Sequence, residues 1–166
     1  MRVFATPHSR TATIEPGGDP RMSSPSQHHH SGQSQDTIII PSDLASAKKP
    51  ERAILQAVAD HGFNEDSIFA IKLTLEEAIT NAIKHGNKSD RSKKVVVRYI
   101  VDAAQIVIYI RDEGAGFDPN AVPDPTSPDR LSLPSGRGIL LMKAYMNEIE
   151  YRHNGTEIIL RKTKDS

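Results

Sequence analysis

Three side chains with complementary chemistry recur four residues apart along one stretch of the chain, namely Glu77, Asn81 and His85. Because a helix turns by about 100° per residue, the three would lie along one flank of a helix. A carboxylate can act as a general base, a carboxamide oxygen can bind a hard cation, and an imidazole can donate to a phosphate. The set therefore fits a site for ATP with magnesium. A solvated helix face is the alternative, and three polar residues alone would favour it.

A second candidate segment, residues 111–118, follows a strand of branched apolar residues. Here Asp112 can accept a hydrogen bond from an exocyclic amine, while Gly114 and Gly116 let a flat ring approach the backbone. An Asp-x-Gly-x-Gly string alone is more often an ordinary turn. Its position between a strand and a proline-rich loop favours an adenine pocket.

A third candidate is the start of a late helix, where Gly136, Arg137 and Gly138 follow a loop. Free backbone N–H groups at a helix N-terminus bind phosphate oxygens, and an arginine there adds positive charge. Gly-x-Gly by itself is a weak signal, and a plain helix start is the alternative. For Arg137 the alternative is a capping role or a surface ion pair.

The elements that must position these residues follow from apolar periodicity and from turn residues. The expected order is a strand at 37–40, helices at 44–60 and 64–85, strands at 94–101 and 105–111, a loop at 113–135, a helix at 139–146, and strands at 148–152 and 157–161. A loop of this length with five prolines is typically functional, and we expect a lid. Hairpins flanked by grouped helices predict an α+β two-layer sandwich rather than a doubly wound parallel sheet.

Composition limits the remaining possibilities. The 166 residues suit one domain, and 21 basic residues balance 21 acidic ones, so we expect neither a nucleic acid nor a membrane as partner. No cysteine is present, which excludes disulfides and thiolate sites and leads us to expect the cytoplasm. Residues 1–35 are rich in Ser, Pro, Gly, Gln and His and predict a disordered tail before a domain at 36–166.

The three segments also match a known pattern. The stretch from Glu77 to Gly86 resembles the N box of the GHKL ATPases, Asp112 to Phe117 their G1 box, Gly136 to Gly138 their G2 box, and Gly155-Thr156 their late glycine-threonine element. Within that superfamily, residues 122–126 and 133–142 are similar to the bacterial anti-sigma factor serine/threonine kinases. The region before the domain has no helix bearing a phosphoacceptor histidine, so we do not expect a complete sensor histidine kinase.

This resemblance implies a Bergerat fold, with a mixed, largely antiparallel sheet packed on helices. It implies that Glu77 is the general base, that Asn81 is the Mg²⁺ ligand and that Asp112 contacts adenine. Thr156 would support adenine through water, and His85 and Arg137 would approach the phosphates. The remaining nucleotide-binding residues that we expect are Gly114, Gly116, Phe117, Gly136 and Gly138.

The resemblance also implies partners. The acceptor would be a serine or threonine of a STAS-type anti-sigma factor antagonist, and the kinase would sequester a sigma factor and form a homodimer. The alternative is a nucleotide-gated binding module with little or no phosphotransfer. A third interpretation, a scaffold that no longer binds ATP, is disfavoured because Glu77, Asn81, Asp112 and the Gly-rich segments all occur together.

Overall fold

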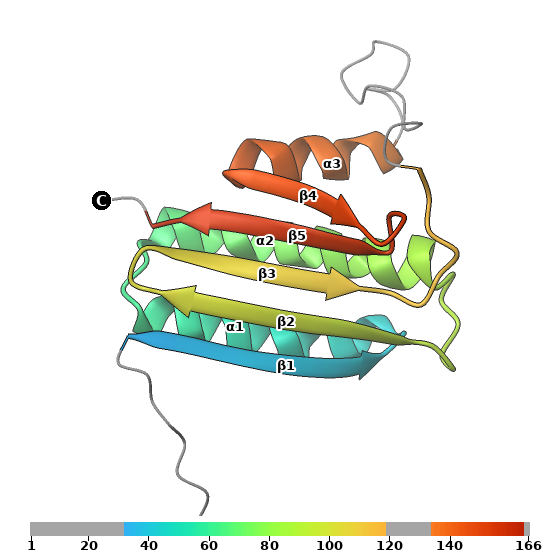
Figure 1. Cartoon of the computed structure of the whole chain (residues 1–166), viewed down its shortest axis with the longest axis horizontal. Helices are drawn as coiled ribbons and strands as arrows, with labels where there is room; N and C mark the ends of the chain where they lie inside the picture. Colours follow the sequence, from blue (N-terminus) through green and yellow to red (C-terminus); the bar gives the residue numbers. More distant parts are fainter. Residues whose placement is uncertain (1–31, 119–133, 165–166) are drawn as a thin grey trace, which may run out of the picture.

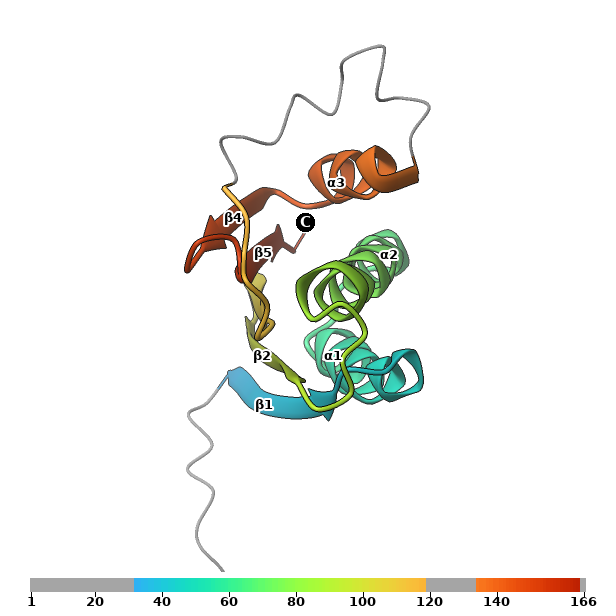
Figure 2. The same cartoon turned by 90° about the vertical axis from the view of Figure 1, so that its right-hand side faces the viewer.

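The computed structural model describes residues 32–118 and 134–164, with the backbone alone at 134–137. Five strands form one sheet in the order β1-β2-β3-β5-β4, and the helices cover one of its faces (Figure 1, Figure 2). The strands are β1 (Gln33–Pro41), β2 (Lys94–Asp102), β3 (Gln105–Arg111), β4 (Glu148–Arg152) and β5 (Glu157–Thr163). The predicted α+β two-layer architecture is confirmed.

The sheet differs from the expected mixed sheet in that all four described pairings are antiparallel. Two helices, α1 (Lys48–Asp60) and α2 (Glu65–Asn81), connect β1 to β2, and the two strands pair antiparallel. A single helix, α3 (Pro134–Tyr145), connects β3 to β4. Those two strands run in the same direction, but β5 lies between them, so they never pair.

Side-chain caps begin the 3-10 turn that precedes α1 and begin α2 itself. Asp43 accepts a hydrogen bond from the Ser46 backbone N–H (3.0 Å) at a 3-10 turn, Leu44–Ala47, which leads into α1. Asn64 accepts from the Ser67 N–H (2.8 Å) at the start of α2. Each cap satisfies one backbone donor that the helix itself cannot.

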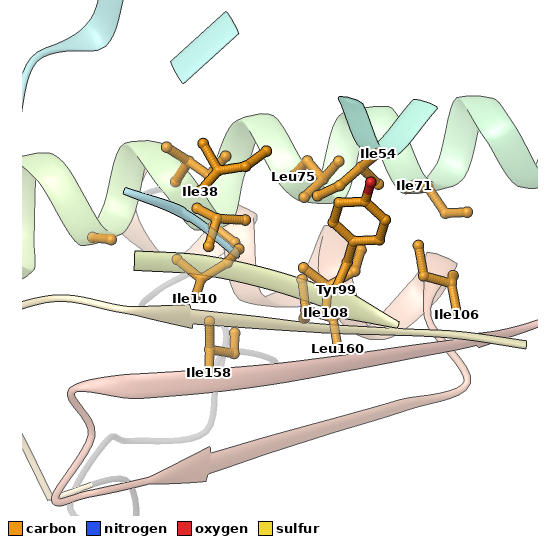
Figure 3. Packing of buried hydrophobic residues seen from close by; sticks show 14 of the residues in the cluster. Ile38, Ile54, Ile71, Leu75, Tyr99, Ile106, Ile108, Ile110, Ile158 and Leu160 are labelled. Atoms are coloured by element: carbon orange, nitrogen blue, oxygen red, sulfur yellow. The ribbon is translucent and has the colours of Figure 1, made fainter. Parts of the chain in front are cut away.

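The core lies between the helices and the inner face of the sheet (Figure 3). Residues of β2 alternate along the strand, with Val95, Val97, Tyr99 and Val101 buried. The apolar stripe predicted for the second helix faces them, and its members Ile71 and Leu75 are fully buried. The spacing of three and four residues on the helix and of two on the strand thus produces one continuous core.

Several boundaries differ from the sequence-based expectation. β1 begins at Gln33, because the nine residues of β2 offer it pairing partners as far as Asp102. The long helix expected at 64–85 ends as α2 at Asn81 and continues as a π-helical turn, Ala82–Gly86. α3 begins at Pro134, since proline is favoured in the first turn of a helix. Residues 1–31 of the expected tail and 119–133 of the expected lid lie outside the described residues.

Within residues 32–118 and 134–164, no helix combines the length and the apolar character that crossing a membrane requires.

Candidate nucleotide site

A cavity of about 420 Å³ opens where the C-terminal end of α2, the end of β3 and the β4–β5 turn meet, at the right-hand end of the molecule in Figure 1. Its volume is within the range of small-molecule sites, about 300–1,000 Å³. The apolar part of its wall comes from Ala78 on α2, Ile110 on β3, Ile139 on α3, and Tyr151 and Ile158 on the last hairpin. The polar part includes Asn81, His85, Asp112 and Thr156. This arrangement suits a flat apolar ring that carries polar groups at its edge.

The helix that supplies Asn81 and His85 changes its geometry between them. After Asn81 the chain follows the π-helical turn, and the backbone N–H of Asn87 donates to the Ala82 carbonyl (2.8 Å). Such turns are frequent at functional sites, because they redirect side chains relative to a regular helix. Asn81 and His85 line the same cavity, as one flank of the helix predicts, and the His85 side chain is exposed at its rim.

Asp112 lines the cavity directly after β3. Its backbone N–H donates to the Thr156 carbonyl (3.0 Å), and its Oδ1 accepts from the Gly114 N–H (2.8 Å). Burial raises the pKa of the Asp112 carboxyl above its ordinary value, and the hydrogen bond from Gly114 and the charge of Lys93 act in the opposite direction. The carboxylate is therefore partly buried and held in place at the cavity, where an exocyclic amine could reach it.

Glycines line this end of the cavity because the backbones approach too closely for a side chain. A Cβ on Gly114 would lie 2.1 Å from the Gly86 carbonyl oxygen, and one on Gly116, whose φ is +76°, would lie 2.1 Å from the Asn154 carbonyl oxygen. A Cβ on Gly155, whose φ is +81°, would lie 2.5 Å from the Phe117 carbonyl oxygen. The Gly-x-Gly spacing therefore reflects close packing of three loops against one another.

Phe117 and Tyr151 close one side of the cavity. Their rings meet edge to face with centroids 5.3 Å apart. The Phe117 N–H donates to the Asn154 carbonyl (2.9 Å), so the residue is fixed by its backbone as well as its ring. Thr156 lines the same cavity and donates its hydroxyl to the His153 carbonyl (2.8 Å). Each of these residues has a polar or aromatic group available to a bound ring.

Glu77 lies one turn before Asn81 on α2 and is outside the residues that line the cavity. It lies instead against the first part of α3, where a Cβ on Gly138 would be 1.8 Å from Glu77 Oε1. Gly136 and Gly138 both belong to the N-terminal part of α3. The side chain of Arg137 lies outside what the structure describes. The expected general base and one of the expected phosphate-binding glycines, Gly138, are thus neighbours.

Three residues around the site were not anticipated from the sequence. Asn87, which lies just after the helix expected at 64–85, is completely buried and hydrogen-bonded to Lys94 and Glu113. Tyr151 and Lys88 line the cavity. Lys88 has a positive φ of 54°, which is rare for a residue other than glycine. The alternation of β4 could have indicated Tyr151, because residues 149 and 151 share one face of that strand.

Comparisons with known proteins agree with this geometry. Residues 40–162 match the family described as histidine kinase-like ATPase domain. Over 120 residues the chain is 31% identical to the serine-protein kinase RsbW of Bacillus subtilis, which covers 67% of this chain and 74% of that protein. Over 99 residues it is 33% identical to an anti-sigma F factor of Clostridium perfringens, covering 55% of this chain and 69% of that protein.

A solved structure has the same fold. The crystal structure of the RsbU and RsbW domains of a Mycobacterium tuberculosis protein superposes with a TM-score of 0.54 over 78% of this chain, at 15% identity. The match spans 31% of that longer chain, and at this identity it supports the fold alone. The family match covers most of the chain and includes all the segments that line the cavity. The chain therefore belongs to the histidine kinase-like ATPase family, in the group that contains the RsbW serine-protein kinases and the anti-sigma F factors.

Proposed function

We propose that this protein is an ATP-binding anti-sigma regulatory factor that phosphorylates a serine or threonine of a STAS-type antagonist and sequesters a sigma factor. The main support for the proposal is that Asn81, Asp112 and Thr156 line one cavity. Glu77 and Gly138 lie next to each other beside these residues. The relatives named serine-protein kinase and anti-sigma F factor support the same activity.

In the proposed complex, adenine occupies the apolar end of the cavity. Asp112 accepts a hydrogen bond from its amino group, Thr156 supports the ring through water, and Phe117 covers one side. The phosphates extend toward His85 and the start of α3, where the backbone N–H groups of Gly136 and Gly138 and the charge of Arg137 would bind them. Gly114 and Gly116 let the loop that follows Asp112 pack against the backbones of Gly86 and Asn154.

Magnesium would bind chiefly through the nucleotide. Among the described residues, no group of three or more His, Asp or Glu side chains could hold a metal ion. Mg²⁺ commonly takes one or two protein oxygens and completes its shell with phosphate and water, and the amide oxygen of Asn81 suits that role. When bound, the ion would neutralise charge that develops on the transferred phosphoryl group.

Glu77 is the proposed general base. Its carboxylate would take the proton of the acceptor hydroxyl as the hydroxyl oxygen bonds to the γ-phosphorus, and the bond to the bridging oxygen of ADP would break. Phosphoserine or phosphothreonine and ADP are the products. Its place outside the cavity lining suits a group that acts on a second, protein substrate rather than on the nucleotide.

The regulatory part of the proposal follows from the same group of relatives. The unphosphorylated antagonist would compete with the sigma factor for the kinase, and phosphorylation would release the kinase to hold sigma. We further propose that the protein acts as a homodimer in the cytoplasm without binding nucleic acid directly.

The test is transfer of radiolabel from γ-labelled ATP to a purified STAS-type antagonist, comparing wild type with Glu77→Gln. The proposal predicts labelled antagonist with wild type, and none with the variant, which should bind ATP as tightly as wild type. ATP binding without transfer in wild type would favour the nucleotide-gated binding module. One observation is compatible with that module: Glu77 does not itself line the cavity.

A further inference from the structure

Three hydrogen bonds form a closed ring between the end of the second helix, the start of β2 and the loop after β3. The Glu113 N–H donates to Asn87 Oδ1 (2.8 Å), Asn87 Nδ2 donates to the Lys94 carbonyl (2.9 Å), and the Lys94 N–H donates to Glu113 Oε2. Asn87 follows the π-helical turn, Lys94 begins β2, and Glu113 follows β3. The ring therefore ties the end of the second helix to the start of β2 and to the loop that carries Asp112.

The ring acts on the site through its sequence neighbours. Asp112 and Gly114 flank Glu113, and Gly86 precedes Asn87. A Cβ on Gly86 would lie 2.3 Å from the carboxyl carbon of Asp112, and one on Gly114 would lie 2.1 Å from the Gly86 carbonyl oxygen. Since these two backbones touch, a displacement at Asn87 or Glu113 would be passed directly to the Asp112 carboxylate.

Asparagine is suited to this position because one side chain must accept and donate at once. The Asn87 side chain is fully buried, so each of its polar atoms requires a partner inside the protein. An aspartate could accept from Glu113 but could not donate to Lys94 and would bury a charge. An alanine would leave the Glu113 N–H and the Lys94 carbonyl without this partner.

We propose that Asn87 and Glu113 are positioning residues, which hold the Asp112 carboxylate where it accepts a hydrogen bond from the amino group of adenine. Selectivity for adenine then depends on this ring of hydrogen bonds. The inference rests on the proposed nucleotide site. It concerns the base, because the ring of hydrogen bonds holds the loop that carries Asp112.

The experiment measures, for the full chain, the ratio of dissociation constants for purine riboside triphosphate, which lacks the 6-amino group, and for ATP. Glu113→Ala should lower the preference for ATP roughly tenfold, the usual effect of misplacing one charge-assisted hydrogen bond. Glu113→Gln keeps an oxygen for the Lys94 N–H and should restore most of the preference. Glu148→Ala, which removes an exposed carboxylate at the far edge of the sheet, is the matched control.

Asn87→Ala should show the same loss, and exposed Glu113 supplies the test if the Asn87 variant does not fold. A purely structural role would lower the folded fraction without changing the ratio measured for folded molecules. In an Asp112→Ala background, Glu113→Ala should cause no further change in the ratio.

The two levels of the proposal fail in different ways. An unchanged ratio in Glu113→Ala and Asn87→Ala, with the preference for ATP lost in Asp112→Ala, would overturn the positioning role and leave the nucleotide site intact. A wild-type protein that binds neither nucleotide would overturn the proposed function and the positioning role together.

Discussion

Gly138→Ala tests whether Glu77 acts at the place where the structure holds it. A Cβ at residue 138 would lie 1.8 Å from Glu77 Oε1, whereas real Cβ contacts are essentially never under 3.0 Å. The carboxylate must therefore move by at least 1.2 Å, the difference between 3.0 and 1.8 Å. A misplacement of about 1 Å can cost a reacting group up to ~100-fold in rate, which corresponds to about 2.7 kcal/mol of barrier.

The fold should tolerate the same change. The atoms in the way belong to the end of a flexible side chain, and alanine is favoured over glycine within a helix by about 0.5–1 kcal/mol. We therefore expect phosphoryl transfer to the antagonist to fall roughly 100-fold. The dissociation constant for ATP should change far less than the transfer rate, because Gly138 would contact the phosphates through its backbone N–H, which alanine keeps. The melting temperature should remain close to that of wild type.

The assay is single-turnover transfer at saturating ATP, with calorimetry for the nucleotide and thermal unfolding for the fold. Glu77→Asp, which withdraws the carboxylate by one methylene, should slow the wild type but add little to Gly138→Ala, since both changes misplace the same group. Full activity in Gly138→Ala would refute the reasoning. A loss of ATP affinity in parallel with the rate would also refute it, because the substitution would then act on the nucleotide.

Three further predictions concern the adenine end of the cavity. Because burial raises the pKa of the Asp112 carboxyl, the folded protein binds a proton at this carboxyl more tightly than the unfolded chain does. The stability that the bound proton contributes is present below pH 3.8 and is lost as pH rises from 3.8 through the raised pKa. Without nucleotide at pH 7, Asp112→Asn should therefore resist urea better than wild type, and this difference in stability should shrink as the pH falls toward 3.8, the ordinary pKa of an aspartate. The same variant should bind ATP roughly tenfold more weakly. Gly116→Ala places a Cβ at a positive φ and against a backbone oxygen, so it should lower the free energy of unfolding by about 1–3 kcal/mol in a denaturant titration. Gly32→Ala, where φ is also positive but the space is open, should lower the free energy of unfolding by less. Phe117→Ala should weaken ATP binding by about 0.5–1.5 kcal/mol in calorimetry, and Tyr151→Phe, which keeps the ring, should not.

Periodicity predicted the strands and the second helix well because these elements bury one face each. The strand expected at 105–111 is β3, and Ile71 and Leu75 are core residues, as their spacing indicates. Periodicity carries no information on which strands become neighbours. The insertion of β5 between β3 and β4 brings Thr156 to Asp112, and that contact depends on the packing of the whole sheet.

Local sequence signals also gave wrong or incomplete predictions where one residue type is typical of two kinds of structure. Prolines indicated a loop as far as residue 135, but proline is also favoured in the first turn of a helix, and α3 begins at Pro134. Asn87 follows a glycine, which is typical of a helix end, and its structural role arises from a partner 26 residues away, Glu113. Contacts of that range cannot be read from neighbouring residues.

The proposed nucleotide site is tested most directly by a calorimetric titration of Mg-ATP into wild-type protein and into Asn81→Ala. We expect magnesium-dependent binding at one site per chain in wild type, and loss of the magnesium dependence in the variant. Absence of ATP binding to the wild-type chain would overturn the proposed site, because the cavity would then be a remnant of the family fold that no longer binds nucleotide.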